Sequence, residues 1–218
     1  MGKYKIFFVS TGRCGTKRIA EILDEHLPDK EFAIKHQMDV SRLSNVLGNI
    51  MYYTGSWEWL KKKLYNHIIH KYANGKHFIC SDPLISIIIP AAIVNDPDTY
   101  IVHIIREQKA FAESFFRFTR KRFLSFFAHN FVPFWQLGVW PLENLLNPHI
   151  KRKYQKVWEK KNEWLQTRYQ INPNYQKITL EQAFSEKTLS EIIESAFNYS
   201  IDISKNQLKV KTNQTAQN

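Results

Sequence analysis

A short loop that combines glycines with cations follows the first apolar run of the chain. The loop consists of Ser10, Thr11, Gly12, Arg13, Cys14, Gly15, Thr16 and Lys17. It lies between a β-rich run at residues 4–10 and a helical pattern at residues 17–27. Backbone N–H groups of such a turn, at the positive end of a helix and beside two cationic side chains, form a cradle for a phosphate-like anion. The alternative is a tight turn between strand and helix with solvent-facing cations.

The positions of the glycines indicate that the backbone of this loop turns tightly or lies close to a ligand. The chain has only 7 glycines among 218 residues, yet Gly12 and Gly15 lie three positions apart. Glycine is favoured where a backbone turns tightly or approaches a ligand closely. The two glycines therefore indicate a turn that is shaped for a ligand.

Two common nucleotide-binding motifs do not fit the spacing. A P-loop NTPase needs glycine before its lysine and Ser or Thr after it, but Thr16 precedes Lys17 and Arg18 stands where the Mg²⁺-binding hydroxyl belongs. The dinucleotide fingerprint G-x-G-x-x-G also fails, because Gly12 and Gly15 have the wrong interval. The loop predicts phosphate chemistry without Mg²⁺, and a metal-dependent P-loop kinase is the alternative from another class.

A second segment of interest follows the most β-like run of the chain, residues 100–105. Arg106 comes directly after this run, and Ser114 lies eight residues later in a helical pattern. Strands that alternate with helices predict an α/β fold with a parallel sheet. Sites in such sheets lie at the carboxyl ends of strands, so we expect the loop after Ser10 and the residues after Ile105 at one edge.

Together, the two segments resemble the cofactor-binding motifs of sulfotransferases, which use 3′-phosphoadenylyl sulfate. Residues 9–16 are similar to the family's 5′-phosphosulfate loop, which commonly reads G-R-S-G-T-T or P-K-S-G-T-T. Arg106 and Ser114 have the interval of the family's 3′-phosphate motif, a strand followed by R-D-P-R and a helix. The resemblance covers most of residues 4–200.

The resemblance implies a three-layer α/β architecture of the P-loop-like kind, in which helices flank a central parallel β-sheet. Trp158 and Thr179-Leu180-Glu181 are fainter matches to later parts of the family pattern. The implied activity is metal-independent transfer of a sulfuryl group from 3′-phosphoadenylyl sulfate to an acceptor. The acceptor is a hydroxyl or amine of a glycan or a small molecule.

The resemblance also assigns roles to individual residues. The implied cofactor-binding residues are Gly12, Arg13, Cys14, Gly15, Thr16, Lys17, Arg106 and Ser114. Arg13 takes the position of the family's catalytic Lys or Arg, and Cys14 replaces the usual serine. Cys14 is either a small substitute for serine or a thiol whose pKa is lowered by the helix N-terminus. Lys17 replaces a loop threonine and Glu107 follows Arg106 without the rigid R-D-P turn, so a catalytically inactive nucleotide-binding relative is a further alternative.

The acceptor needs a general base, for which the sequence offers two candidates. His36, in Lys35-His36-Gln37, resembles the H-E pair of some bacterial members of the family, and imidazole titrates near neutrality. Asp82, in Ser81-Asp82-Pro83, follows a strand candidate, where sites of α/β sheets lie. We favour His36 over Asp82. We expect no metal site, because no cysteine or acidic cluster completes the pair His67 and His70, and we expect His103 to be a packed strand residue.

The remaining pattern predicts one domain over residues 1–203 with a polar tail at 204–218. Further strands are expected at residues 77–80 and 176–179, and further helices at residues 40–53, 57–73, 84–94, 108–127, 150–169 and 188–197. An aromatic-rich insertion spans about residues 128–150. The aromatic stretch from Phe123 to Trp140 lines an acceptor pocket or forms an aromatic core or dimer surface.

Composition narrows the range of partners. With 31 Lys and Arg against 20 Asp and Glu, the chain carries a formal charge of +11. Basic clusters at residues 61–63, 117–122 and 151–153 are solvated faces, or they attract an anion, for which the polyanionic cofactor is the simplest candidate. Nucleic-acid-binding motifs are absent, so we expect no nucleic acid partner.

Cysteine content and apolar runs bear on the compartment. Two cysteines do not make a disulfide scaffold and fit a reducing environment. The longest apolar run, residues 84–94, is shorter than the ~20 residues of a bilayer span, and the first residues lack a signal-peptide core. We expect a cytoplasmic protein without a transmembrane segment.

Overall fold

A single parallel sheet organises the chain. The computed structural model describes residues 4–55, 57–132 and 150–203, and the structural statements below concern these residues. Its strands pair in the order β2-β3-β1-β4-β5, and all four pairings are parallel. The strands are β1 (Lys5–Ser10), β2 (Phe32–Lys35), β3 (His77–Cys80), β4 (Thr99–Ile105) and β5 (Tyr175–Thr179).

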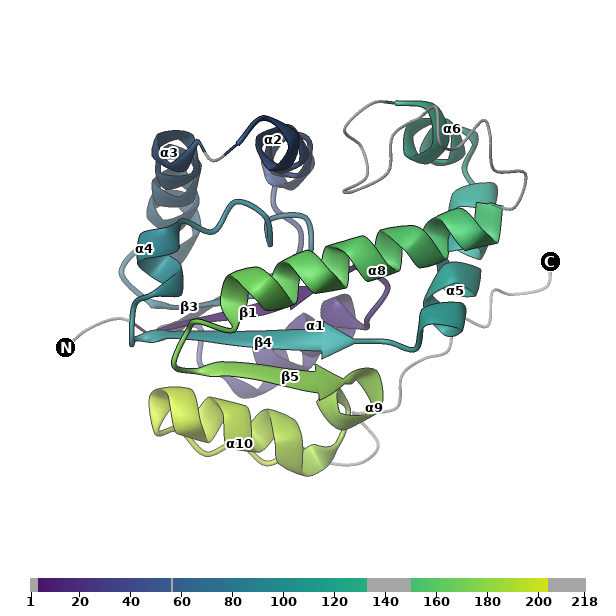
Figure 1. Ribbon diagram of the computed structural model, residues 1–218. Coiled ribbons are helices and arrows are strands. Elements are labelled where there is room, and N and C mark those ends of the chain that lie inside the picture. Colours follow the sequence, from purple (N-terminus) through teal and green to yellow (C-terminus); the bar gives the residue numbers. More distant parts are fainter. Residues whose placement is uncertain (1–3, 56, 133–149, 204–218) are drawn as a thin grey trace.

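Helices cover both faces of this sheet (Figure 1). One face carries α1 and α10, and the other carries α3 and α8, so the architecture has three layers with the sheet in the middle. The helices are α1 (Thr16–His26), α2 (Ser41–Thr54), α3 (Glu58–Ile68), α4 (Ala91–Val94), α5 (Gln108–Arg120), α6 (Phe123–Phe131), α8 (Ile150–Tyr169), α9 (Leu180–Ala183) and α10 (Glu186–Phe197). A π-helical turn, η1 (Ile69–Ala73), continues α3.

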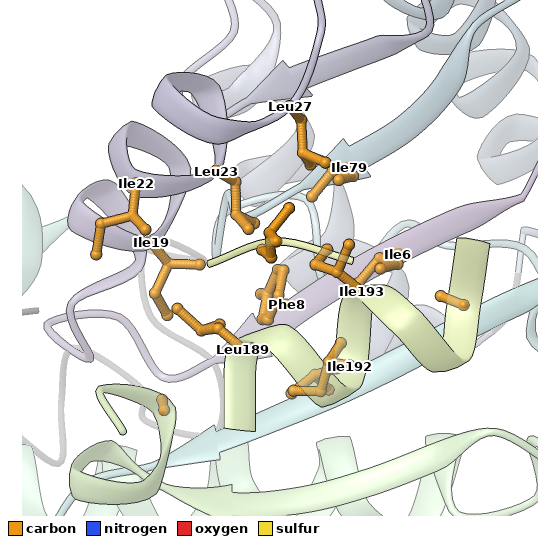
Figure 2. Close-up of a cluster of buried hydrophobic side chains, with 14 of the residues drawn as sticks. Ile6, Phe8, Ile19, Ile22, Leu23, Leu27, Ile79, Leu189, Ile192 and Ile193 are labelled. Carbon is orange, nitrogen blue, oxygen red and sulfur yellow. The ribbon is translucent and has the colours of Figure 1, made fainter. Parts of the chain in front are cut away.

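Strand β1 is buried on both faces. Ile6 and Phe8 point toward α1 and α10, where they join Ile19, Leu189 and a cluster of further aliphatic side chains (Figure 2). Phe7 and Val9 alternate to the other face and pack with side chains of α3 and α8. A continuous apolar run is typical of a strand that is covered on both sides. This burial fixes the position at which β1 ends, and therefore the position of the loop that follows.

The predicted α/β fold with a central parallel sheet is confirmed, as are the strand predictions near residues 4–10, 77–80, 100–105 and 176–179. The edge strand β2 (Phe32–Lys35) was missed, since four residues carry little periodicity. The prediction of helix at residues 84–94 is wrong over its first part. Turns occupy this stretch until Pro90, and only Ala91–Val94 are helical. Pro90 has a φ of −66° and precedes the first helical residue, so it starts the helix instead of lying inside it.

The prediction of one long helix over residues 108–127 is also wrong. The helix ends at Arg120, Arg122 is extended, and α6 then starts at Phe123. This break turns the second helix away from the first and allows α6 to pack beside the start of α8 (Figure 1). Most of the predicted aromatic insertion and the predicted tail lie outside the described residues. None of the helices in the described part of the chain combines the length and the apolar composition needed to cross a bilayer.

Candidate active site

The loop between β1 and α1 is tightly wound. Gly12 and Arg13 have φ angles of 90° and 56°, and Gly15 follows at 69°. The Ser10 hydroxyl accepts a hydrogen bond from the Gly12 N–H at 3.1 Å, and the Cys14 thiol donates to the Gly12 carbonyl at 3.2 Å. A left-handed conformation costs a non-glycine residue roughly 1–2 kcal/mol, so Arg13 is held there by its surroundings.

Gly15 is required for two reasons. Its φ lies in the left-handed region, and a Cβ at this position would come within 2.5 Å of the Phe184 ring. Gly15 also precedes the first residue of α1, where no side chain of the described residues caps the helix and no acidic residue occupies the first turn. The first N–H groups of α1 are therefore suited to an external anion.

The structure brings Arg13, Arg106 and Ser114 together. The Arg106 Nη1 donates to the Arg13 carbonyl at 2.9 Å across 93 sequence positions. The Arg13 Nε donates to the Ser114 hydroxyl at 3.5 Å across 101 positions. Because β1 and β4 are adjacent and parallel, their carboxyl ends place the loop next to Arg106 and the start of α5.

Positive charge is concentrated around Arg13. Burial, and then the charge of Arg106, lowers the pKa of Arg13, with smaller contributions from Arg117 and Arg122. The guanidiniums of Arg13 and Arg122 both lie over the Phe118 ring, at 4.9 and 5.5 Å from its centroid. Within the described residues, none of these four arginines forms an ion pair with a carboxylate. We call Arg13, Arg106, Arg117 and Arg122 the arginine cluster.

Glu107 stabilises the turn between β4 and α5. Its carboxylate accepts hydrogen bonds from the N–H groups of Lys109 and Ala110 at 2.9 and 2.6 Å, and these bonds lower its pKa. Glu107 therefore caps α5. The Trp158 indole N–H donates to the Arg106 carbonyl at 2.9 Å and holds the same turn from α8.

Cys14 is a buried part of the loop. Its side chain is fully buried, and burial raises the pKa of the thiol. This shift is opposite to the one that a reactive thiolate requires. The structure favours the interpretation of Cys14 as a small substitute for serine.

His36 and Asp82 meet on the other side of the loop, at the ends of β2 and β3. The His36 Nδ1 lies 3.0 Å from the Ser81 carbonyl, which can only accept, so this nitrogen carries the proton and Nε2 is the free base of the neutral ring. The Ser81 hydroxyl donates to the Thr16 carbonyl at 2.9 Å and connects this region to the first turn of α1.

The Asp82 carboxylate is almost completely enclosed. It accepts hydrogen bonds from the Ser41 hydroxyl and, at 2.9 Å, from the Leu84 N–H. Burial raises the pKa of Asp82, while these hydrogen bonds and the charge of His36 act in the opposite direction. Asp82 is only 2% exposed, so its carboxylate is poorly placed to receive a proton from a bound acceptor. It is better suited to orient neighbouring side chains and to stabilise positive charge on them.

Lys161 is a member of this region that the sequence analysis missed. It lies on α8, is 6% exposed, and donates from Nζ to the Pro83 carbonyl at 3.2 Å. Burial lowers the pKa of Lys161 to about 8, and the nearby carboxylate of Asp82 opposes this shift. The helical spacing from Tyr154 through Lys161 to Leu165, all buried, is the signal that places Lys161 on the inner face of α8.

The other predicted residues have less central positions. Lys17 points outward, with a side chain that is 76% exposed and lies 3.5 Å from the Glu21 carboxylate. His103 is fully buried in β4 and hydrogen-bonds to Tyr175 and Asn162 at 2.9 Å each, as a packed strand residue does. Within the described ranges, no three His, Cys, Asp or Glu side chains are arranged to hold a metal ion.

Comparisons with known proteins were made with both the sequence and the fold. No family model matches the chain, and no curated protein matches it. Among solved structures, "Crystal Structure of Sulfotransferase from Alicyclobacillus acidocaldarius" is similar with a TM-score of 0.51 and 12% identity, over 95% of this chain and 89% of that one. The chain therefore has a sulfotransferase-like fold, as the two sequence motifs predicted.

Proposed function

We propose that the protein is a sulfotransferase that uses 3′-phosphoadenylyl sulfate as its co-substrate. The observation that carries this proposal is the arginine cluster, which lacks carboxylate partners within the described residues and adjoins the uncapped start of α1. Arg13 and Arg106 are half-buried, and crowded guanidiniums repel one another, so such an arrangement is stabilised by a polyanionic ligand. A nucleotide with phosphates at both ends of its ribose and a sulfuryl group matches this charge.

In this proposal the loop and Arg106 bind different parts of the nucleotide. The backbone N–H groups of Cys14, Gly15 and Thr16 bind the 5′-phosphosulfate, and Arg106 and Ser114 bind the 3′-phosphate. The co-substrate supplies the sulfuryl group and a phosphate leaving group. Arg13 donates hydrogen bonds to the oxygens on which negative charge develops as the S–O bond breaks.

In this proposal the region of His36 activates the acceptor. Its free Nε2 takes the proton from the acceptor hydroxyl or amine as the new bond to sulfur forms, and Asp82 stabilises the resulting imidazolium. Lys161 balances the charge of Asp82 and adds a cation beneath the loop. The acceptor in this proposal is a hydroxyl or amine of a glycan or a small molecule.

Two other functions make different predictions. A P-loop kinase needs a hydroxyl for Mg²⁺ after its lysine, but Arg18 occupies that place and lies 3.3 and 3.6 Å from the carboxylates of Glu21 and Glu25. A catalytically inactive nucleotide-binding relative is favoured by Lys17, which extends into solvent where the family has a threonine.

Thermal unfolding with nucleotides tests the proposal. We expect 1 mM adenosine 3′,5′-bisphosphate to raise the Tm in the presence of EDTA, and ATP with Mg²⁺ to raise it less. Stabilisation by ATP only when Mg²⁺ is present would identify a kinase, and the absence of any shift with the bisphosphate would refute nucleotide binding of the proposed kind. Transfer of label from ³⁵S-labelled co-substrate to a panel of phenols, amines and sugars then separates an active enzyme from an inactive relative.

A further inference from the structure

Helix α6 exposes a row of large apolar side chains. Phe123 and Leu124 are 78% and 81% exposed, and Phe127 and Phe131 are also exposed. At 3.6 residues per turn these four positions fall within about 100° of one another, on one side of the helix. Exposed apolar patches of this kind mark contacts with proteins or membranes. We call these four residues the α6 apolar face.

The last turn of α6 is fastened to the rest of the protein. The buried Lys153 of α8 donates to the His129 carbonyl at 2.8 Å and to the Asn130 side-chain oxygen at 2.9 Å. The Asn130 amide in turn donates to the Tyr154 hydroxyl at 3.4 Å. These polar contacts fix the rotation of the helix, so the α6 apolar face is held outward and cannot turn into the core without breaking them.

Exposed cations lie in the segments next to the α6 apolar face. The exposed cations at the end of α5, before α6 and at the start of α8 are Arg117, Arg120, Lys121, Arg122, Lys151 and Arg152. These three segments lie at one end of the molecule (Figure 1). Between Glu113 and Glu159 the sequence has a single acidic residue, Glu143, against eight Lys and Arg residues.

We propose that the α6 apolar face and its surrounding cations form a docking surface for a bilayer of anionic phospholipid. Phenylalanine and leucine side chains insert at the boundary between headgroups and acyl chains, while the cations bind lipid phosphates. A soluble anionic glycan uses such cations but has no use for exposed Phe and Leu. A second copy of the chain would bring two cationic rims together, which like charge opposes.

The docking surface shares Arg117 and Arg122 with the arginine cluster, but lipid binding does not depend on the reaction at the candidate active site. Phe118 lies under both Arg13 of the loop and Arg122 of the rim. A docked molecule therefore holds the loop close to the membrane surface. The proposal stands or falls by lipid binding, whichever reaction the site performs.

Vesicle sedimentation with the full chain tests the proposal. We expect binding to 3:1 phosphatidylcholine:phosphatidylglycerol vesicles in 0.1 M NaCl, and at least tenfold weaker binding to pure phosphatidylcholine. The double variant Phe123→Ser/Leu124→Ser should bind the anionic vesicles at least tenfold more weakly, as should Arg120→Gln/Lys121→Gln. Because these side chains are exposed, the Tm should change little.

A control variant removes two other exposed apolar side chains elsewhere. Leu43 and Ile171 are 56% and 63% exposed and lie outside α6, so Leu43→Ser/Ile171→Ser should bind vesicles like the wild type. Equal binding to neutral vesicles, or no binding to either, would overturn the proposal. So would loss of binding in the arginine–lysine variant alone, since that result indicates a purely electrostatic site for soluble polyanions. Sedimentation velocity adds a final outcome: a wild-type dimer that Phe123→Ser/Leu124→Ser converts to a monomer, without vesicle binding, would assign the face to a second copy.

Discussion

The two sides of the loop after β1 differ in how their charges are balanced. On the side of α5, the four guanidiniums of the arginine cluster have no carboxylate partner within the described residues. On the side of β2 and β3, a buried carboxylate, an imidazole and a buried ammonium lie close to one another, as Asp82, His36 and Lys161. The α5 side therefore carries unneutralised positive charge, whereas the β2–β3 side combines charges of both signs in an enclosed environment.

In the proposed function, this difference corresponds to two tasks within one site. An unneutralised cluster of fixed charges binds an anion, and arginine is suited to this because it stays protonated at any physiological pH. A mixed group of titratable side chains passes and receives protons, because each charge can be compensated by its neighbours. We therefore expect variants on the α5 side to affect nucleotide affinity and leaving-group stabilisation, and variants on the β2–β3 side to affect acceptor activation and pH dependence.

The largest expected effect follows replacement of Arg13, which belongs to the α5 side but touches the reacting group in the proposal. Arg13→Ala should lower kcat by ~10²–10³, the scale for loss of one preorganised donor to a developing negative charge. Arg13→Lys should keep part of the activity, because a point charge replaces the planar fork. Steady-state kinetics with a surrogate phenol measures both. Arg152→Ala, which removes an exposed arginine of α8, is the control, and wild-type turnover in Arg13→Ala would reduce Arg13 to a surface cation beside a turn.

Arg106 separates the two ends of the nucleotide. Arg106→Ala should cost about 2–4 kcal/mol of affinity for adenosine 3′,5′-bisphosphate, because a bound phosphate loses a bidentate, charge-assisted contact. Calorimetric titration measures this loss, and adenylyl sulfate, which lacks the 3′-phosphate, should bind almost unchanged. Arg106 also donates to the Arg13 carbonyl, so equal losses for both nucleotides would show that it acts only by shaping the loop.

His36 tests the other side of the comparison. His36→Gln should lower kcat about a hundredfold, at the lower end of the range for a general base, with little change in bisphosphate affinity. The low-pH limb of the pH–rate profile, where protonation blocks the base, should disappear with it. Asp82→Asn should lower kcat by less and keep that limb, because Asp82 acts through His36. If Asp82→Asn removes the limb and His36→Gln does not, the roles are reversed.

The fold and the α5 side of the site could be predicted because their signals are local. The β-rich run that ends at Ser10, the glycine spacing and the interval from Arg106 to Ser114 each lie in a few consecutive residues. A parallel sheet then places the two segments side by side without further information. The same reasoning missed the helix break at Arg122, since no proline or glycine marks it.

The β2–β3 side could be predicted only in part. His36 and Asp82 were both candidates, but their proximity depends on the pairing of a short edge strand, β2, that has no clear pattern. Lys161 was hidden in a helix with many lysines, and only its position relative to the buried Tyr154 and Leu165 distinguishes it. A charged residue inside the protein is a tertiary feature, and a sequence pattern does not reveal what it faces.

The buried ammonium of Lys161 predicts that the stability of the protein depends on pH. Because its pKa is lowered from 10.5 to about 8 in the folded protein, the unfolded chain binds a proton between these pH values that the folded chain has released. The free energy of unfolding should therefore rise with pH, by about 1 kcal/mol from pH 7 to pH 9 relative to Lys161→Met, in which this contribution is absent. Urea unfolding at both pH values gives the difference. A parallel pH dependence of the two proteins would mean that Lys161 keeps an ordinary pKa and that this side of the loop is not enclosed.

The smallest expected effect concerns Ser114, an uncharged residue next to the arginine cluster. Its hydroxyl accepts from the Arg13 Nε at 3.5 Å, a long and weak contact that leaves its own proton available for a phosphate oxygen. Ser114→Ala should therefore cost about 1 kcal/mol of affinity for adenosine 3′,5′-bisphosphate, the value of one hydrogen bond, and nothing for adenylyl sulfate. Ser195→Ala, at an exposed position of α10, is the control for the measurement. A loss of affinity in Ser114→Ala as large as that in Arg106→Ala would contradict this assignment, because a neutral hydroxyl would then contribute as much as a charge. In that case the Ser114 hydroxyl would hold the arginine cluster in place instead of binding the nucleotide beside it.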